Sequence, residues 1–315
     1  MVDLETGIRR ITFPMPLGLD HVHCYLLPAE GGGWTVVDTG LGLPDAAERW
    51  RRIVEQLDEP VVRIVITHFH PDHVGAAADL GGLTGAPVFQ GADDYAQCLR
   101  TWGELRVEER MPKYLQLHGA PREDVESFRT EATAFVRLVR FARDPEPLSA
   151  GDEVDGWVVL HLPGHADGHL ALLRDGILVA GDTLLGSISP NIGLYPDSRP
   201  DPLGDYLTSL NRIAELGPRV AFPGHGEPIG DPAGRARELI AHHQERLEQT
   251  AAALDGRPQT AYDVSLKLFP EPLSTTLRRF ALAETRAHIE YLVKRDKARL
   301  VEEPDRISYL GTTRE

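Results

Sequence analysis

Residues 67–75, with the sequence Thr-His-Phe-His-Pro-Asp-His-Val-Gly, place three histidines and an aspartate within six positions. They follow residues 61–66, an apolar run rich in β-branched side chains that predicts a buried strand. His68 and His70 are two residues apart, so both imidazoles lie on one side of the chain while it stays extended. The proline then favours a helix start, and Asp72 suits the positive end of that helix. This spacing predicts four ligand-type side chains at the end of a strand, rather than a polar loop with unrelated histidines.

Three later segments have the same form, in which a short apolar strand is followed by a glycine turn and a histidine or aspartate. They are residues 163–169, 181–183 and 223–228. Glycine lets the backbone turn sharply without steric cost, so the strand end can present a ligand. Four such strand ends in one chain indicate a shared site rather than coincidence.

These motifs resemble those of the metallo-β-lactamase-fold hydrolases, in the branch that includes glyoxalase II, over roughly residues 8–235. The resemblance implies an α/β fold, the αββα sandwich, with two metal ions. Residues 36–40 resemble the family's early strand and turn, where an aspartate, here Asp38, supports the metal loop; a simple turn residue fits the sequence equally well. Carried over position by position, the resemblance assigns one metal to His68, His70 and His165, the second to Asp72, His73 and His225, and the bridge to Asp182.

The ligand set argues against a dedicated β-lactamase, because a cysteine commonly stands at the position of Asp182 in the β-lactamases that this fold includes. Five imidazoles and two carboxylates suit two zinc ions, with iron or manganese as alternatives. Two ions roughly 3.5 Å apart can share a water and lower its pKa, giving a hydroxide nucleophile without serine or cysteine. We expect Asp72 to orient this hydroxide. Tyr195, in the loop after Asp182, is a candidate contact for the oxyanion or the leaving group.

The composition is that of a globular enzyme of 315 residues, 42% of them hydrophobic and 26% charged. Two cysteines make a disulfide scaffold improbable, and no run approaches the length of a membrane span, so a cytoplasmic location is expected. The formal net charge is −15; residues 261–315, with ten basic and nine acidic side chains, contribute +1, which leaves −16 on residues 1–260. An acidic catalytic domain repels long polyanions, so nucleic acid is not the expected substrate.

We expect a metal-hydrolase domain over residues 1–235 and a small helical domain over residues 236–315. Residues 92–143 interrupt the α/β rhythm with a helical insertion, divided by breaks at Pro112 and at residues 118–121. The insertion predicts a lid over the metal cleft, although helix packing or a homodimer contact would explain its aromatic residues as well. The tail, three helices followed by a hairpin, resembles the winged-helix appendage of some hydrolases of this fold, and its small net charge argues against DNA binding.

Three functional classes remain. The first is a hydrolase of a small-molecule thioester, ester or lactone, as in hydroxyacylglutathione hydrolase-like enzymes. The second is a single-strand-specific endoribonuclease of the same fold, and the third is a non-catalytic regulatory metal-binding protein, which the complete ligand set disfavours. Among the remaining histidines, His21 and His23 share one strand face, either at the rim of the site or exposed to solvent, whereas His169, His242 and His243 are expected to be helix or loop residues rather than ligands.

Overall fold

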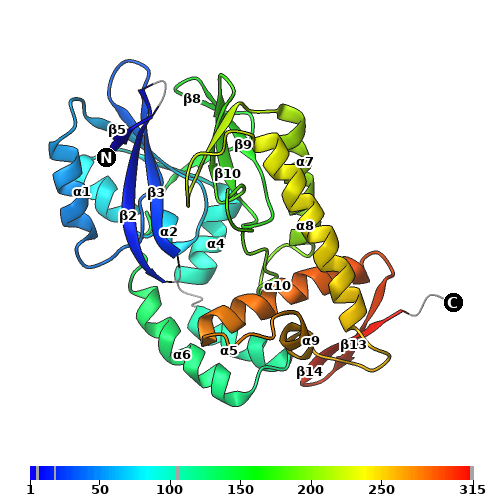
Figure 1. Ribbon diagram of the computed structural model, residues 1–315. Helices are drawn as coiled ribbons and strands as arrows, with labels where there is room; N and C mark the ends of the chain where they lie inside the picture. The colour runs from blue at the N-terminus through cyan, green and yellow to red at the C-terminus, as the bar shows by residue number, and fades with distance from the viewer. Residues whose placement is uncertain (5–6, 18, 104–106, 313–315) are drawn as a thin grey trace.

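The computed structural model describes residues 1–4, 7–17, 19–103 and 107–312. Two β-sheets face each other, helices cover their outer faces, and a mostly helical lobe lies below them in Figure 1. This architecture is the αββα sandwich predicted from the sequence, so the predicted fold class is confirmed.

The first sheet has seven strands in chain order from β1 to β7. Neighbouring strands are antiparallel up to β4 and parallel from β4 to β7. Strand β5 lies between β4 and β6, and the histidine-rich loop follows its carboxyl end. The strands are β1 Val2–Asp3, β2 Arg9–Leu17, β3 Leu19–Pro28, β4 Trp34–Val37, β5 Val61–Ile66, β6 Val88–Gly91 and β7 Glu146–Leu148.

The second sheet has five strands in the order β12-β11-β10-β9-β8. Strands β11 and β12 are parallel, and β9 runs in the same direction because β10 is antiparallel to both β9 and β11. The carboxyl ends of β9, β11 and β12 therefore meet at one edge, and the three later motifs follow these ends. The strands are β8 Glu153–Val154, β9 Trp157–His161, β10 Leu170–Arg174, β11 Ile177–Gly181 and β12 Val220–Pro223.

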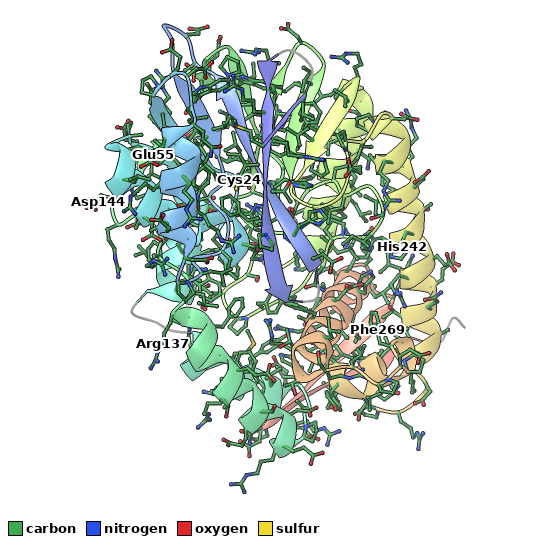
Figure 2. The ribbon with its side chains drawn as sticks, turned by 60° about the vertical axis from the view of Figure 1, so that its left-hand side comes forward. Cys24, Glu55, Arg137, Asp144, His242 and Phe269 are labelled. Carbon is green, nitrogen blue, oxygen red and sulfur yellow. The ribbon has the colours of Figure 1, made fainter. Side chains whose placement is uncertain are left out.

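Three apolar layers hold the sandwich together. One lies between the first sheet and its outer helices, where Trp50 is fully buried, one between the two sheets, and one between the second sheet and its helices. Strand β3 shows the alternation that supplies two layers at once, because Cys24 faces the outer layer and Tyr25 the inner one. Figure 2 shows Cys24 among the strands, whereas Glu55 and His242 lie at the periphery. Each large apolar side chain buried in this way contributes about 1.5–3 kcal/mol.

Helices cover the outer face of the first sheet, and the first of them is α1, Ala46–Glu55. After the histidine-rich loop the chain forms the short helix α2, Pro71–Val74, and then, after a break, α3, Ala77–Thr84. The break arises because the N–H of Ala76 bonds to the carbonyl of Gly40 instead of continuing the helix.

The insertion forms α4 Ala92–Trp102, α5 Val107–Leu117 and α6 Arg122–Val136. The break expected at Pro112 is wrong, because this proline lies inside α5. Proline removes one helical hydrogen bond, but Met111, Tyr114 and Leu115 of the same helix are buried, which offsets that loss. The break expected at residues 118–121 is found between α5 and α6.

The carboxy-terminal part consists of three helices and a hairpin, in the predicted order, after α7, Pro202–Leu216, of the sandwich. Thr260 and Asp263 form a capping box at the start of α9, and Ser274 caps α10. These elements are α8 Pro232–Ala253, α9 Ala261–Leu268, α10 Thr275–Val293, β13 Ala298–Glu303 and β14 Arg306–Gly311.

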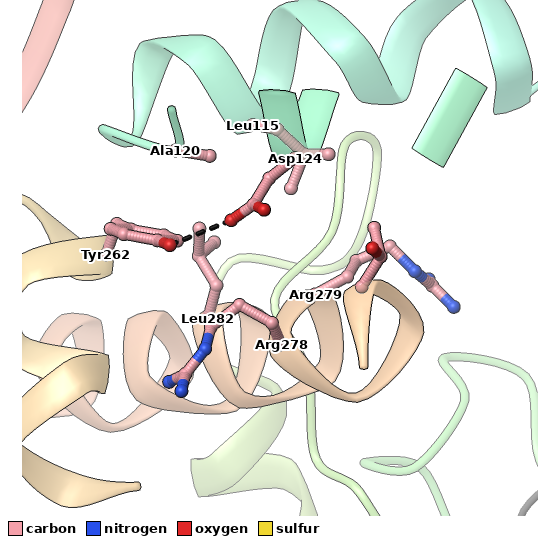
Figure 3. A pocket seen from close by; sticks show the side chains of 8 residues that line it. Leu115, Ala120, Asp124, Tyr262, Arg278, Arg279 and Leu282 are labelled. Atoms are coloured by element: carbon pink, nitrogen blue, oxygen red, sulfur yellow. Dashed lines mark hydrogen bonds between the residues drawn. The ribbon is translucent and has the colours of Figure 1, made fainter. Parts of the chain in front are cut away.

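The insertion and the carboxy-terminal helices build the lower lobe together. Leu282 of α10 joins an apolar cluster with Met111 and Phe128 of the insertion. Beside this cluster the Tyr262 hydroxyl donates to Asp124 Oδ2 at 2.8 Å, which ties α9 to α6 (Figure 3). In the parts of the chain that the structure describes, no helix is long and apolar enough to cross a membrane.

Candidate metal centre

The first group of predicted ligands lies at the carboxyl end of β5. His68 and His70 leave this strand end, and Pro71 then starts the short helix α2, which carries Asp72 and His73. Proline at the first helical position needs no partner for a backbone N–H and sets the turn. The four side chains predicted from the spacing are therefore brought together by one strand-to-helix junction.

The second sheet supplies the other three predicted ligands, His165, Asp182 and His225, from the carboxyl ends of β9, β11 and β12. Glycines allow the close approach. Gly164 has a φ of +138°, and a Cβ there would lie 2.4 Å from the Cβ of Tyr206. A Cβ on Gly224 would lie 2.3 Å from Asp182 Oδ1, so only glycine fits beside this carboxylate.

Three imidazole nitrogens form the first cluster. His70 Nδ1 lies 3.1 Å from His68 Nε2 and 2.8 Å from His165 Nε2. These atoms converge on a common point, as the ligands of one metal ion do. The cluster consists of the three residues that the family resemblance assigned to the first metal.

Asp72, His73 and His225 form a second cluster beside the first. Asp72 Oδ2 lies 3.2 Å from His225 Nε2 and 3.8 Å from His73 Nε2. Asp182 lies between the clusters, because its Oδ2 is 3.3 Å from His225 Nε2 and 3.7 Å from His165 Nε2. The structure thus brings all seven predicted ligands together, with Asp182 where a bridging carboxylate would have to be.

Unpaired buried atoms show that these residues suit metal ions. His73 Nε2, His225 Nε2 and Asp182 Oδ1 have no hydrogen-bond partner among the described residues. A buried polar atom without a partner costs about 1–3 kcal/mol, so three of them at one point would be a substantial penalty. Coordination of cations would satisfy all three atoms, and the donor set of imidazole and carboxylate suits zinc, iron or manganese.

The electrostatics of the site also favour positive charge at this point. Burial raises the pKa of Asp72, but His73 and His225 outweigh it and lower that pKa to about 2. Burial lowers the pKa of His225, but Asp182 and Asp72 outweigh it and raise the pKa to about 10. The carboxylates are therefore ionised at neutral pH and attract either protons on the histidines or metal cations, which compete for the same atoms.

Comparison with known proteins identifies the family. The model of the metallo-beta-lactamase superfamily matches residues 17–225, well over half of the chain. The chain belongs to this superfamily. A second model, for the metallo-beta-lactamase-like C-terminal domain, matches residues 247–310. The predicted membership is confirmed, and the protein is a metallo-hydrolase of the superfamily.

Similar proteins cover nearly the whole chain. Probable metallo-hydrolase YqjP of Bacillus subtilis (strain 168) is 29% identical over 299 residues, 90% of this chain and 91% of that protein. The structure of the metallo-beta-lactamase family protein TTHA1429 from Thermus thermophilus is 40% identical, with a TM-score of 0.83, over 97% of this chain and 99% of that one. The structure of TTHA1623 in a di-iron-bound form is 26% identical, with a TM-score of 0.50, over 73% of this chain and 96% of that one.

Asp38 supports the metal loop of this metallo-beta-lactamase-type site. Its Oδ1 accepts from the Thr67 N–H at 2.8 Å, and its Oδ2 accepts from the Thr67 hydroxyl at 2.8 Å and lies 2.7 Å from His73 Nδ1. The carboxylate therefore orients the His73 ring so that Nε2 faces the cluster. Of the two roles left open by the sequence, the structure selects this one over a simple turn residue.

Helix α4 of the insertion holds the same loop from the other side. Asp94 Oδ1 accepts from the Phe69 N–H at 2.9 Å, and Trp102 Nε1 donates to the Phe69 carbonyl at 2.8 Å. Phe69 stands between two predicted ligands, so both of its peptide groups are fixed. Burial raises the pKa of Asp94 to about 7. Trp102, an aromatic residue of the insertion, thus helps to hold the metal loop.

His169 is a functional residue that the sequence analysis missed. It is fully buried, its Nε2 accepts from the Asp182 N–H at 3.1 Å, and its ring stacks on His68 with centroids 4.7 Å apart. His169 is a loop residue outside the predicted ligand groups, as expected, but its contacts with Asp182 and His68 give it a supporting role at the site. A position four residues after His165 in the same motif was the signal that could have indicated a role.

The alternative that His21 and His23 are exposed to solvent is wrong, because β3 is an interior strand and His23 is buried. His21 Nε2 accepts from the Gly226 N–H at 3.1 Å, and His23 Nε2 donates to the Gly226 carbonyl at 2.9 Å. The carbonyl of His21 lies 2.6 Å from His225 Nδ1. The pair clamps the loop that presents His225, in agreement with the alternative at the rim of the site.

Tyr195 is linked to the predicted ligand His165 through one intervening residue, Asn191. Its hydroxyl donates to Asn191 Oδ1 at 2.9 Å, and the Asn191 carbonyl lies 3.0 Å from His165 Nδ1. Burial raises the pKa of the phenol, so it remains protonated at neutral pH. The structure thus places Tyr195 in the support of a predicted ligand. His243 is buried on α8 beside His288, away from the seven predicted ligands.

Proposed function

We propose that the protein is a binuclear metal-dependent hydrolase that cleaves a thioester, ester or lactone of a small molecule. One observation supports this most strongly, namely that Asp182 lies between the two ligand clusters, with Oδ2 3.7 Å from His165 Nε2 of the first cluster and 3.3 Å from His225 Nε2 of the second. Two ions held in this way would lower the pKa of a shared water and polarise the carbonyl oxygen of the substrate.

Asp72 provides a hydrogen-bond acceptor for the attacking water. The low pKa of Asp72 keeps its carboxylate ionised at neutral pH, so it can accept a hydrogen bond from the attacking water but cannot donate one. In the hydrolysis the water oxygen bonds to the carbonyl carbon, the bond to sulfur or oxygen breaks, and the leaving group takes up a proton. Asp72 orients the water for this attack.

A covalent acyl-enzyme on cysteine is not part of this proposal. Cys24 and Cys98 are both buried, and burial raises the pKa of each thiol. A thiolate nucleophile is therefore disfavoured at both positions. Rapid quenching during turnover of an acyl substrate should accordingly yield no acylated protein, whereas an acyl adduct trapped on either cysteine or on a serine would contradict the mechanism.

We propose zinc as the resident metal, with iron or manganese as alternatives. The donor set without thiolate suits all three ions. The di-iron-bound form of TTHA1623 supports iron as a realistic occupant, because that protein is 26% identical to this chain.

The proposed substrate is a compact acyl compound, and a single-strand-specific ribonuclease activity is the second candidate. The net charge of −15 supports the acyl substrate, because it disfavours association with a long polyanion. A regulatory metal-binding role without catalysis is a third, weaker candidate, since a non-catalytic protein needs no shared carboxylate between two clusters.

A substrate panel distinguishes these candidates. Zinc-loaded protein is assayed on thioesters, esters, lactones and single-stranded RNA, with His70→Ala as the inactive control. We expect turnover of at least one acyl class that is lost in the control. Efficient RNA cleavage that His70→Ala abolishes, without acyl hydrolysis, would favour the ribonuclease, and no turnover of any substrate would favour the regulatory role.

A further inference from the structure

Glu284 and Asn191 connect the carboxy-terminal helix α10 to the predicted ligand His165. Asn191 Nδ2 donates to Glu284 Oε2 at 3.0 Å, across 93 residues of sequence. The backbone carbonyl oxygen of the same asparagine lies 3.0 Å from His165 Nδ1. The connection therefore runs from a helix outside the sandwich to an imidazole of the first cluster.

The contact at His165 fixes the ring. A carbonyl oxygen only accepts, so His165 Nδ1 carries the proton and donates it to Asn191. Nε2 is then the unprotonated nitrogen, and it is the atom that faces His70 Nδ1 and Asp182. Metal-binding histidines generally need such an acceptor on the second nitrogen, which sets the tautomer and the ring orientation.

Asn191 itself is held mainly by α10. Besides the bond to Glu284, its Nδ2 lies 3.4 Å from the Phe280 carbonyl, and its Oδ1 accepts from Tyr195 at 2.9 Å. Three residues further on, the Leu194 N–H donates to the Ala283 carbonyl at 3.0 Å. The loop between the bridging aspartate and α7 therefore rests on one face of α10.

A buried histidine pair fixes the same helix against α8. His288 Nδ1 donates to the Glu284 carbonyl at 2.8 Å, and His288 Nε2 accepts from His243 Nδ1 at 3.2 Å. Burial lowers the pKa of His288 to about 4 and that of His243 to about 3, so both rings are neutral at neutral pH. His243 Nε2 is left as an acceptor and lies 3.5 Å from the Ser189 hydroxyl, on the same loop as Asn191. The loop is thus anchored at two points by carboxy-terminal helices.

We infer that Glu284 is a positioning residue for the metal ligand His165, acting through Asn191, so that α10 sets the geometry of the first metal position. This inference rests on the proposed metal centre and adds to it a role for the carboxy-terminal domain. The Glu284 carboxylate accepts from the Asn191 side chain and so holds this residue in place. The backbone carbonyl of Asn191 can then accept from His165 Nδ1, which leaves His165 Nε2 facing the proposed metal position.

The test compares Glu284→Ala with Glu284→Gln and with a matched variant on the same helix. Glutamine retains an oxygen that can accept from Asn191, whereas alanine does not. Glu290→Ala is the matched control, because Glu290 also lies on α10 and accepts a hydrogen bond, but from the Tyr309 hydroxyl of β14 at 2.8 Å rather than from Asn191. Zinc affinity is measured by competition with a chromophoric chelator, and thermal unfolding of the metal-free proteins shows whether each variant folds.

We expect Glu284→Ala to weaken binding of one zinc ion roughly 10-fold, the lower end of the range for losing a direct partner of a ligand, because Glu284 acts through Asn191. Glu284→Gln and Glu290→Ala should remain close to the wild type. With an active substrate, the loss should appear in kcat rather than in KM. Wild-type affinity in Glu284→Ala, or an equal loss in Glu290→Ala or Glu284→Gln, would overturn the inference.

The two proposals fail in different ways. Wild-type protein that binds two zinc ions but hydrolyses no acyl compound would overturn the proposed reaction and leave the affinity comparison valid. Wild-type protein that binds none of zinc, iron and manganese would overturn both the metal centre and the role of Glu284.

Discussion

Gly224→Ala adds a single methyl group and tests how closely Gly224 packs against the predicted ligands Asp182 and His73. A Cβ at this position would lie 2.3 Å from Asp182 Oδ1 and 2.7 Å from His73 Cε1. The backbone cannot retreat easily, because the Gly224 N–H donates to the Gly181 carbonyl and the Gly224 carbonyl accepts from the His23 N–H. The carboxylate or the imidazole therefore has to move.

The size of the movement follows from the contact distance. Real Cβ atoms essentially never come within 3.0 Å of another heavy atom, so the Asp182 oxygen would have to retreat by at least 0.7 Å, the difference between 3.0 and 2.3 Å. Metal–ligand distances deviate from their usual values by only about 0.2 Å. A misplacement approaching 1 Å at a reacting centre costs about 100-fold in rate, and we expect a loss of this size in kcat/KM together with weaker binding of both ions.

Gly82→Ala is the matched control, since a Cβ on this helical glycine meets no atom within 4 Å. It should retain both metals and be more stable by roughly 0.5–1 kcal/mol, because alanine favours the helix. Metal equivalents are measured by elemental analysis, activity on the best acyl substrate, and stability by melting of the metal-free proteins. If Gly224→Ala retained two equivalents and full activity, the packing argument would be refuted.

Three further predictions follow from the surroundings of the site. His169→Phe should reduce metal affinity and cost about 1–3 kcal/mol in urea unfolding, because the Asp182 N–H loses its acceptor; an unchanged midpoint would contradict this. Asp182→Ala should weaken both metal sites and His225→Ala mainly one, so elemental analysis showing equal losses would contradict the bridge. The folded pKa of Asp94, about 7, lies above its unfolded value, so the carboxyl's contribution to stability is fully present below about pH 4 and is lost as pH rises through 7. In urea unfolding of the metal-free protein, the wild type should therefore lose up to about 4 kcal/mol between pH 4 and 8 that Asp94→Asn does not lose. Identical pH profiles of the two proteins would be evidence against this.

The candidate ligands could be recognised because their information is local, whereas their assignment to two metals came from the family resemblance. Each motif couples an apolar strand to a glycine turn and a ligand within a few residues, as in Gly164-His165 after β9 and Gly224-His225 after β12. The strand ends then meet because β9, β11 and β12 run in the same direction in one sheet. Local pattern and topology together are sufficient to place these side chains at one point.

The supporting residues could not be predicted because their partners are distant in the sequence. His23 contacts Gly226 across 203 residues, and Glu284 contacts Asn191 across 93. No periodicity or spacing rule connects such pairs. The break after α2 has the same origin, since it depends on the carbonyl of Gly40.

The packing of the insertion against the carboxy-terminal helices in one lobe could likewise not be predicted from the sequence. Each segment shows its own helical pattern, but only the structure shows that Leu282 packs with Met111 and Phe128. Pro112 inside α5 follows from this packing, because the burial of Met111 and Tyr114 offsets a missing hydrogen bond that local rules count as a break.

Anomalous diffraction from crystals of the metal-loaded protein, recorded at the absorption edge of the bound metal, tests the binuclear centre most directly. The account predicts two peaks about 3.5–4 Å apart, one against His68, His70 and His165 and one against Asp72, His73 and His225. The carboxylate of Asp182 should contact both peaks. A single peak, or a second peak outside these ligands in fully loaded crystals, would contradict the account.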